Sequence, residues 1–327
     1  MKVLVTGANG LLGHHVVMQL IDLMHDVNIV VRSRRNIYFD ISKTTVTEGE
    51  FTHYKTLKLA AQSCDAIIHM AAVTATDLLH YEDYRKINVD GSKLILQVAD
   101  ELKINNIVFV STANTIGYGT KERLADESAE IEFPFSKSFY AQSKVEAEKL
   151  YVEASKKADR HVVIVNPTFM IGSHDTKPSS GKLMLMGYKK RIMFAPNGGK
   201  NFVAVSDVAA AICNALTHGK NGSRYLASDV NLSFKEFYQI QSRVGGYSQK
   251  IIVLPDFLLE LAGKIGDLVR FLGVKTEICS MNLNQLTIRE YYSNEQVVSK
   301  LKMPQKDLEK AISEALNWFK QNNKIRV

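Results

Sequence analysis

A tyrosine and a lysine stand four positions apart in FYAQSKVEAEKL (139–150). On a helix, Tyr140 and Lys144 would lie on the same face, because residues at i and i+4 are neighbours there. An ammonium group beside a phenol lowers the pKa of the phenol and prepares it for proton transfer near neutral pH. The chain contains 13 tyrosines, so such a pair also arises by chance. Its meaning therefore depends on the other motifs.

A glycine-rich stretch, TGANGLLG (6–13), follows an apolar run at the N-terminus and leads into a helical pattern. Glycines spaced three apart let the backbone turn sharply and approach a pyrophosphate, and the helix N-terminus offers it unpaired amides. The alternative is a tight turn without a ligand, but the position between strand and helix favours a dinucleotide. The residues expected to contact it are Gly7, Asn9, Gly10, Leu11, Leu12 and Gly13.

The choice of dinucleotide depends on the end of the second apolar run, VVRSRR (30–35). NAD-binding folds place a carboxylate there, on the ribose 2′-hydroxyl. This chain has Arg32, Ser33 and Arg35 instead, and guanidinium groups suit the 2′-phosphate of NADP. NADP is therefore predicted, with Arg32 as the first contact, and NAD is the less favoured cofactor. The alternative is an exposed basic turn.

Apolar runs alternate with helical patterns through the first half of the chain. Continuous apolar runs are typical of strands buried on both faces, and their alternation with helices predicts an α/β fold with a doubly wound parallel sheet, a Rossmann domain. The predicted strands are 2–6, 27–32, 65–70, 106–112 and 161–166, and the predicted helices lie near 11–25, 54–63, 82–103 and 138–157.

After about residue 170 the pattern changes to loops and shorter helices. Helical patterns there cover 206–217, 233–243, 255–272 and 307–321. We expect a Rossmann domain over 1–170, to which 200–220 returns, and a smaller, mostly helical substrate-binding lobe over 171–327, interleaved with it.

The composition is ordinary for a globular enzyme, with 46% hydrophobic and 23% charged residues in 327. The net charge of +7 is spread along the chain, which favours a small anionic ligand over a nucleic-acid groove. Three distant cysteines and the absence of metal-ligand spacing argue against disulfides and a metal site. The start, MKVLVTG, shows no signal peptide, and charges interrupt the apolar stretch 254–274, so we expect a cytoplasmic protein without a membrane span.

Further motifs follow in a fixed order along the chain. After TGANGLLG come HMAA (69–72), NVDG (88–91), VSTANTIGYG (110–119), YAQSK (140–144), NPT (166–168) and FVAVSDVAAAICNAL (202–216). This order resembles that of the extended short-chain dehydrogenases/reductases, the NAD-dependent epimerase/dehydratase superfamily. The stretches 166–182 and 222–237 look most like its dihydroflavonol-4-reductase-like branch.

The resemblance implies catalytic roles. Tyr140 and Lys144 would be the catalytic pair, and Lys144 would also hold the nicotinamide ribose. Thr112 would steady the substrate carbonyl, with Ser111 as the alternative. Asn88, in NVDG, resembles a residue that holds a water in the proton relay; alternatively, it is a polar residue that satisfies backbone groups.

The resemblance also implies further cofactor contacts. Ala71 and Ala72 would let the cofactor approach the sheet, and Pro167 and Thr168 would border the nicotinamide. Near the adenine the family usually shows Asp followed by an aliphatic residue. Glu50-Phe51 stands there, and this departure leaves the adenine contacts open.

Among the family's reactions, the sequence favours reduction. Dehydratases carry Asp-Glu after the catalytic threonine, where this chain has Ala113-Asn114, and NADP usually serves net reduction. The leading hypothesis is an NADPH-dependent reductase of a small-molecule ketone or aldehyde, with the proton from Tyr140. The alternatives are a nucleotide-sugar epimerase or related sugar-modifying enzyme and, from another class, a non-catalytic NADP sensor or scaffold. Relatives often dimerise through long helices, here 82–103 and 138–157.

Overall fold

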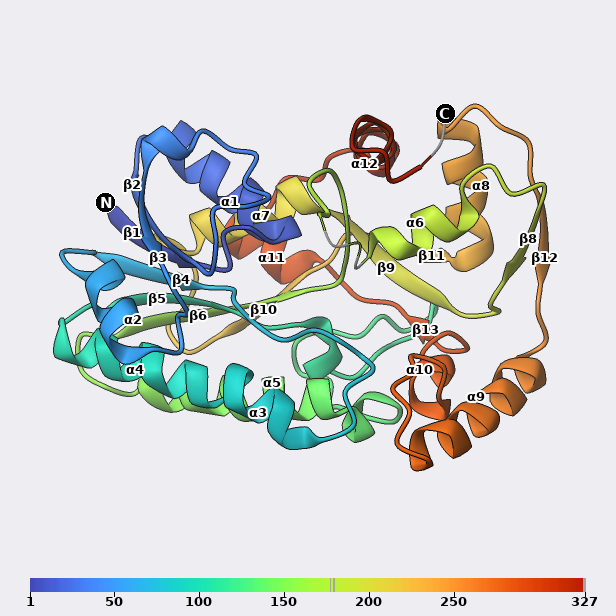
Figure 1. The fold of residues 1–327 in the computed structure, drawn as a ribbon, viewed down its shortest axis with the longest axis horizontal. Coiled ribbons are helices and arrows are strands. Elements are labelled where there is room, and N and C mark those ends of the chain that lie inside the picture. The colour runs from blue at the N-terminus through green and yellow to red at the C-terminus, as the bar shows by residue number, and fades with distance from the viewer. Residues whose placement is uncertain (177, 179, 326–327) are drawn as a thin grey trace.

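The computed structural model describes residues 1–176, 178 and 180–325. A seven-stranded sheet, in which every neighbouring pair is parallel, forms its centre in the order β10-β6-β5-β4-β1-β2-β3 (Figure 1). Its strands are β1 (Lys2–Thr6), β2 (Asp26–Val31), β3 (Thr44–Glu48), β4 (Ala66–His69), β5 (Asn106–Val110), β6 (His161–Pro167) and β10 (Arg224–Ala227). The predicted doubly wound parallel sheet is confirmed.

Helices cover both faces of this sheet. One face carries α1 (Leu11–Asp22), α7 (Val205–Asn214) and α11 (Glu295–Leu301), and the other carries α2 (Tyr54–Ala61), α4 (Asp90–Glu101) and α5 (Phe139–Ala154). Val3 and Val5 belong to the core below α1, whereas Leu4 belongs to the core on the opposite side. Since successive strand side chains point to opposite faces, both must be apolar, which explains the continuous apolar runs.

Three features of this half differ from the sequence-based prediction. Strand β3 was not predicted, because TTVTE (44–48) is mostly polar and lies at the sheet edge. The helix expected over 82–103 is divided at Val89 into α3 (Tyr81–Asn88) and α4. The sheet also gains β10 from late in the chain, which pairs with β6.

The C-terminal part is mostly helical, as predicted, and also contains short strands. Its helices are α6 (Gly181–Gly187), α8 (Phe234–Val244), α9 (Asp256–Phe271), α10 (Ser280–Asn284) and α12 (Leu308–Gln321). Strand β9 (Gly199–Ala204) pairs with β7 (Phe169–Ile171), β11 (Val230–Ser233) and β13 (Arg289–Glu290), and β8 (Ile192–Ala195) pairs with β12 (Lys250–Val253). Stacked Phe202 and Phe237 rings, 4.4 Å apart, lie in its core.

The chain crosses between the two parts more than once. Helix α7 packs on α1, and β10 joins the large sheet, before α8 to α10 complete the C-terminal part. The expected domain boundaries and the dimer through 82–103 and 138–157, now α3, α4 and α5, stay predictions.

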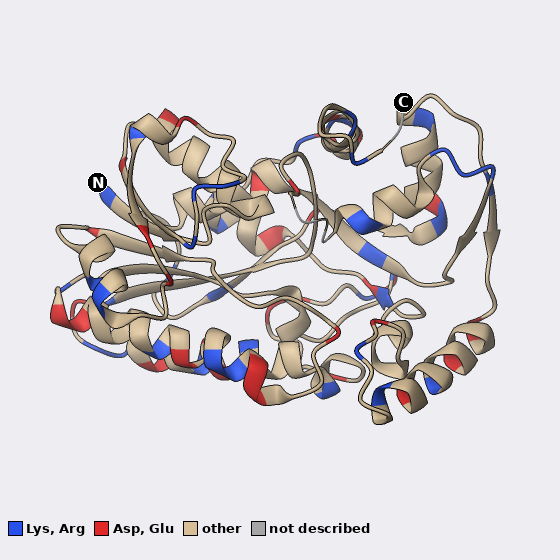
Figure 2. Ribbon diagram, viewed as in Figure 1, with Lys and Arg blue, Asp and Glu red and all other residues tan. Residues whose placement is uncertain are grey.

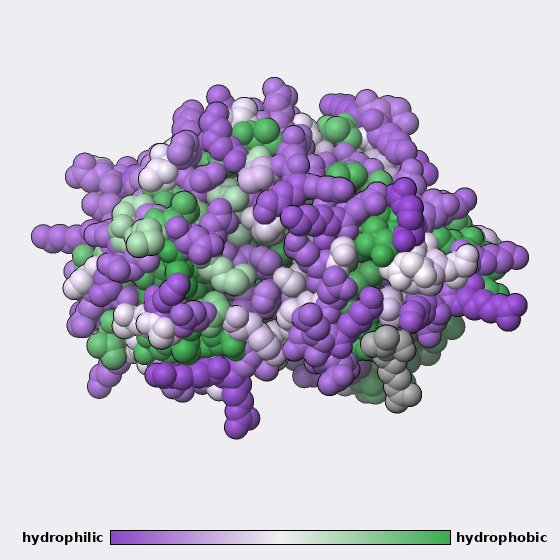
Figure 3. Space-filling view, turned by 90° about the horizontal axis from the view of Figure 1, so that it is seen from above, coloured by the Kyte–Doolittle hydropathy of each residue, from purple (hydrophilic) through white to green (hydrophobic). Residues whose placement is uncertain are grey.

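The molecular surface is mostly polar where α1, α8 and α12 are seen from above, with smaller hydrophobic areas between hydrophilic side chains (Figure 3). Within the described chain, no helix combines the length and hydrophobicity needed to cross a bilayer.

Candidate active site

The carboxyl ends of the central strands bring the predicted motifs to one edge of the sheet. Strand β1 lies between β2 and β4, so the chain order reverses beside it. Ligands of open α/β sheets bind at such a switch point. The glycine turn follows β1, the alanines follow β4, and the Ser111-Thr112 segment follows β5.

Two glycines of the turn, Gly7 and Gly13, have no room for a side chain. Gly7 has a φ of +79°, and a Cβ there would lie 2.9 Å from the backbone nitrogen of Ala71. A Cβ on Gly13 would lie 2.1 Å from the carbonyl oxygen of Gly7. These close approaches require glycine and leave the backbone accessible to a pyrophosphate.

The rest of the turn presents backbone to the sheet edge. Gly10 is the N-cap of α1, so the first amides of this helix have no intrahelical partner. Leu12 is buried in the core, while Asn9 and Leu11 are partly exposed. Thr6 accepts hydrogen bonds from the backbone nitrogens of Met70 and Ala71, both at 3.2 Å, and fixes the end of β4 beside the turn.

The basic residues after β2 follow at the same edge, because Val30 pairs with Thr6 in the sheet. Arg34 is paired with Glu48 at 2.7 Å. Arg32 and Arg35 are exposed, and no ion pair engages them among the described residues. The Ser33 hydroxyl accepts from the Arg35 backbone nitrogen at 3.2 Å. Arg32 and Arg35 are therefore available to an anion, while Arg34 holds the turn against β3.

A buried histidine links this basic turn to the glycine turn, and the sequence analysis missed it. His14 Nδ1 lies 2.8 Å from the Gly10 carbonyl oxygen, and Nε2 lies 3.1 Å from that of Asn36. Burial lowers the pKa of His14. In the sequence, only the position of His14 directly after the glycine motif could have indicated this role.

Tyr140 lies in the first turn of α5, where the Ser138 side chain caps the helix by accepting from the Ala141 backbone nitrogen. The phenol is partly buried and lies near the Thr112 side chain. Burial raises the pKa of Tyr140 to about 12, and the Thr112 hydrogen bond opposes this rise. The phenol is thus protonated at neutral pH.

Lys144 lies one turn further along α5 and is almost fully buried. Its Nζ donates to the Val110 carbonyl oxygen at 2.9 Å and lies 4.1 Å from the centre of the Phe109 ring. Burial lowers the pKa of Lys144 to about 7, and the nearby Glu148 carboxylate opposes this shift. Burial therefore outweighs the expected lowering of the phenol pKa, because it favours the neutral form of each group.

The two candidate hydroxyls after β5 have different surroundings. Thr112 reaches Tyr140, and its Oγ1 also accepts from the Asn114 backbone nitrogen at 3.3 Å. The Ser111 hydroxyl is buried and has no hydrogen-bond partner among the described residues. This geometry favours Thr112 as the residue beside a substrate carbonyl, although its catalytic role stays a prediction.

Asn88 connects two elements of the site. Its Oδ1 accepts from the Val73 backbone nitrogen at 2.8 Å, and its Nδ2 donates to the Val73 carbonyl oxygen and to Ser143 Oγ at 3.1 and 2.9 Å. Ser143 in turn donates to the Tyr140 carbonyl oxygen. These contacts match the structural alternative, in which Asn88 satisfies backbone groups and holds α5 against the end of β4.

Behind Lys144 lies a buried polar network that the sequence analysis missed. The Oε1 atom of Glu148 accepts from Thr115 Oγ1 and Asn166 Nδ2, both at 2.7 Å, and its Oε2 lies 3.5 Å from Nη1 of Arg224. Asn166 also donates to the Thr112 carbonyl oxygen at 3.1 Å. The spacing of Glu148, four residues after Lys144, was the available signal.

The remaining predicted cofactor residues differ in burial and in the residues that they contact. Phe51 packs against Gly91 and the His69 ring, whereas Glu50 is exposed and lies 3.7 Å from His53. Thr168 donates from Oγ1 to Asn201 Oδ1 at 2.7 Å.

Pro167 and Ala72 are the last of the predicted cofactor residues. Pro167 is buried at the end of β6, and Ala72, like Ala71, is partly buried after β4. The glycine turn, the alanines and the free arginines thus fit a dinucleotide, whereas Glu50 lies at the surface. The described residues contain no group of three His, Cys, Asp or Glu that could hold a metal ion.

Comparison with known proteins supports this picture. The NAD dependent epimerase/dehydratase family matches residues 3–230. A Synechocystis protein provisionally named a dihydroflavonol 4-reductase is 26% identical, covering 98% of this chain and 95% of that protein. A 4-hydroxy-2-methyl-3-oxo-4-farnesyl-3,4-dihydroquinoline-1-oxide ketoreductase from Stigmatella aurantiaca is also 26% identical, over 82% of this chain and 80% of that protein.

Solved structures share the fold. The UDP-glucose 4-epimerase of Thermus thermophilus, solved with NAD, has a TM-score of 0.76 at 18% identity and covers 98% of this chain and 99% of that one. RMD from Pseudomonas aeruginosa, solved with NADPH, has a TM-score of 0.72 at 17% identity with the same coverage. The family indicated by the order of motifs is confirmed, and with it an enzyme of the NAD(P)-dependent oxidoreductase type.

Proposed function

Since the chain belongs to the NAD-dependent epimerase/dehydratase family, we propose that it is an NADPH-dependent reductase of ketones or aldehydes. The observation that carries this proposal is the group formed by Thr112, Tyr140 and Lys144 at the end of β5, at the same edge of the sheet as the glycine turn after β1. The exposed Arg32 and Arg35 at the end of β2 support NADP over NAD.

The cofactor residues divide by the part of NADPH that they hold. The turn from Gly7 to Gly13 binds the pyrophosphate, and Arg32, Ser33 and Arg35 bind the 2′-phosphate. Lys144, whose Nζ donates to the Val110 carbonyl oxygen, would hold the nicotinamide ribose. When bound, the reduced nicotinamide supplies the hydride that the carbonyl carbon receives.

The protein supplies the proton and orients the carbonyl. Thr112 and Tyr140 donate hydrogen bonds to the carbonyl oxygen, which gains negative charge as the hydride arrives. Tyr140 then transfers its proton to this oxygen, giving the alcohol and leaving a phenolate. The Lys144 ammonium stabilises the phenolate, and a proton from solvent restores the phenol.

The substrate class is an apolar carbonyl compound. A relative named for reducing a farnesyl-bearing quinoline ketone supports this choice. The second candidate is a nucleotide-sugar epimerase, in which the NAD is recycled within each turnover. The fold that this chain shares with a UDP-glucose 4-epimerase is compatible with that activity. A sensor or scaffold is less favoured, because this chain retains both Tyr140 and Lys144.

The test combines cofactor identification with turnover. Mass spectrometry of the cofactor released from freshly purified protein should detect NADP(H), and NADPH should be oxidised with a panel of ketones and aldehydes. Tyr140→Phe should reduce turnover by about a thousandfold or more, with little change in the Kd for NADPH. Tyr54→Phe is the matched control, because that hydroxyl lies on the exposed side of α2. Tightly held NAD, or full activity of Tyr140→Phe, would contradict the proposal.

A further inference from the structure

Helix α9 presents its apolar face to solvent. Phe257, Leu258, Leu261, Ile265, Leu268 and Leu272 recur at helical spacing and are each between 41% and 71% exposed. Phe271, beside them, is 85% exposed. An ordinary surface helix turns such a stripe toward the core. This helix does the reverse, and large contiguous apolar surfaces of this kind indicate an interaction site.

Packing on the opposite side fixes this orientation. Gly263 and Gly266 are buried against the segment that leads into α10, where added Cβ atoms would lie 2.8 Å from Ser280 Cα and 1.8 Å from the Ile278 carbonyl oxygen. The helix thus packs through its small residues and cannot rotate its large ones inward.

The two-stranded ribbon of β8 and β12 continues the exposed surface at the same end of the molecule (Figure 1). Ile192 and Phe194 of β8 are about half exposed, at 48% and 55%, and Ile252, which pairs with Phe194, is 36% exposed. We refer to the exposed faces of α9 and this ribbon together as the apolar edge.

The segments that lead into the two strands of the ribbon carry charge of one sign. Neither 176–206 nor 237–255, which supply the two strands and the loops before them, contains an Asp or Glu. Figure 2 shows basic but no acidic ribbon along the loops that lead into β8 and β12. Next to the two strands, the exposed cations among the described residues include Lys189, Lys190, Arg191 and Lys250, whereas the exposed Lys182 and Arg243 are paired with Glu277 and Glu309.

The α9 region carries charges of both signs, with Asp256, Glu260, Asp267 and Glu277 against Lys264, Arg270 and Lys275. Asp256 accepts from Asn197, Asp267 accepts from the Ser280 backbone nitrogen at 3.0 Å, and Glu277 pairs with Lys182 at 2.5 Å. Glu260 is exposed, and Lys264 and Lys275 are exposed near it. The positive excess along the apolar edge therefore comes from the cations beside the ribbon, while the border of α9 is mixed.

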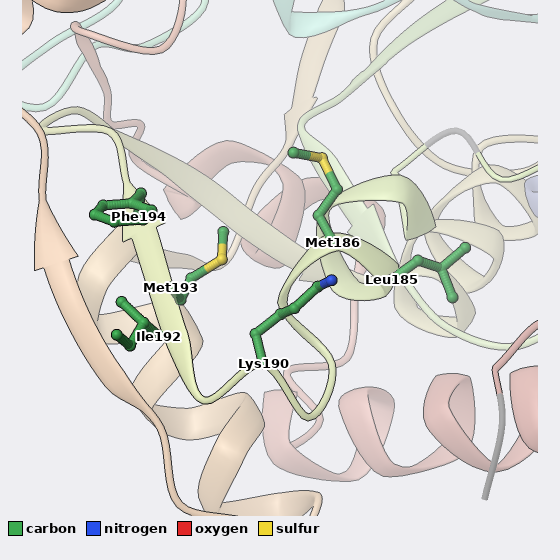
Figure 4. Close-up of a pocket in the computed structure, with 6 residues that line it drawn as sticks. All are labelled: Leu185, Met186, Lys190, Ile192, Met193 and Phe194. Atoms are coloured by element: carbon green, nitrogen blue, oxygen red, sulfur yellow. The ribbon is translucent and has the colours of Figure 1, made fainter.

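A recess of about 650 Å³ lies within this border (Figure 4). Leu185, Met186, Ile192, Met193 and Phe194 line it, and Lys190 is its one charged residue. An apolar recess with an ammonium at its rim suits a molecule with an anionic head and an apolar body.

We propose that the apolar edge docks on the surface of a bilayer that contains anionic phospholipids. Exposed aliphatic and aromatic side chains flanked by lysines are the pattern by which a helix lies in the membrane interface, with basic residues at the headgroups. A second copy of this chain is the less favoured occupant. Its four cations beside the ribbon would lie close to the same four cations of the first copy and would repel them.

The apolar edge also adjoins the proposed active site. Arg270 of α9 donates to the Leu78 carbonyl oxygen at 2.8 Å, and Asn282 of α10 donates to that of Thr76 at 3.1 Å. This loop also receives the hydroxyl of Tyr84, whose ring lies 6.5 Å from that of Tyr140. Docking would thus bring the bilayer close to the loop 75–78, which Tyr84 connects to Tyr140.

Vesicle flotation with the full-length protein tests the proposal and needs neither cofactor nor turnover. The protein should float with phosphatidylcholine vesicles that contain about one third phosphatidylglycerol, and less with phosphatidylcholine alone. Leu261→Glu combined with Leu268→Glu should reduce binding by about tenfold or more, because both side chains would carry charge into the interface. Leu59→Glu, on exposed α2, is the matched control and should float like the wild type.

Each outcome decides the proposal. Thermal unfolding verifies that the variants are folded. We expect them to be folded, because the substituted side chains are exposed to solvent. Wild-type protein that fails to float, or a Leu261→Glu/Leu268→Glu variant that floats as well as Leu59→Glu, overturns it. A dimer in light scattering that this double variant dissociates, without vesicle binding, would assign the apolar edge to a second copy and also overturn it. A failure of NADPH oxidation leaves this result unaffected.

Discussion

Replacement of Glu148 by glutamine tests how the buried lysine keeps its charge. The glutamine side chain has nearly the same shape as that of glutamate and could still accept from Thr115 and Asn166, but it carries no charge. Glu148 stands one helical turn from Lys144, which places its carboxylate and the Lys144 ammonium on the order of 6 Å apart. Two unit charges at that distance interact by roughly 2–3 kcal/mol at an effective dielectric constant of about 20. Since Arg224 offsets part of this, the pKa of Lys144 should fall by about one to two units below its value of about 7.

The direction of the effect on catalysis follows from the proposed mechanism. Reduction requires the Lys144 ammonium, so kcat/KM falls as pH rises through the pKa of Lys144. In Glu148→Gln the alkaline limb of the profile should therefore lie about one to two pH units lower, with rates closer to wild type in acid. Glu146→Gln is the control, because Glu146 lies on the same helix but accepts from Tyr81. Superimposable alkaline limbs for wild type and Glu148→Gln would refute the reasoning.

Stability provides a readout that does not depend on turnover. Lys144 has a folded-state pKa of about 7, below its ordinary value of 10.5. Between these values the unfolded chain binds more protons, so the free energy of unfolding contributed by this group rises with pH across that window. In Glu148→Gln this rise should begin at lower pH, which urea unfolding at a series of pH values would detect. The same onset in both proteins would show that Glu148 does not act on Lys144.

The remaining predictions concern the cofactor turn, the hydroxyls and the basic tip. Gly13→Ala should weaken NADPH binding by about tenfold or more in fluorescence titration, because its Cβ would meet the Gly7 carbonyl oxygen at 2.1 Å. Thr112→Val should lower kcat by about a hundredfold while Ser111→Ala changes it little; the opposite order would exchange their roles. Arg32→Ala should raise the KM for NADPH by about tenfold without affecting NADH, whereas Arg34→Ala, which loses only its pairing with Glu48, should affect both cofactors equally.

The sequence determined the features that depend on neighbours along the chain. Continuous apolar runs predicted five of the sheet strands, and helical periodicity predicted α1, α5 and α9 within a few residues. The glycine turn and the Tyr140–Lys144 spacing are also local features of the sequence. The prediction of a parallel sheet then placed these motifs near the carboxyl ends of its strands. Strand β3 escaped prediction because its polar composition reflects an edge position that only the assembled sheet defines.

The tertiary structure decided what depends on residues far apart in sequence. The contact of Glu148 with Asn166 and Arg224, and the pKa shifts of Tyr140 and Lys144, arise from burial between elements that meet only in the folded chain. The outward orientation of the α9 apolar face is of the same kind, because periodicity gives a helix an apolar stripe without saying what covers it. Close packing of distant segments sets burial, and burial sets both the charge of an ionisable group and the exposure of an apolar one.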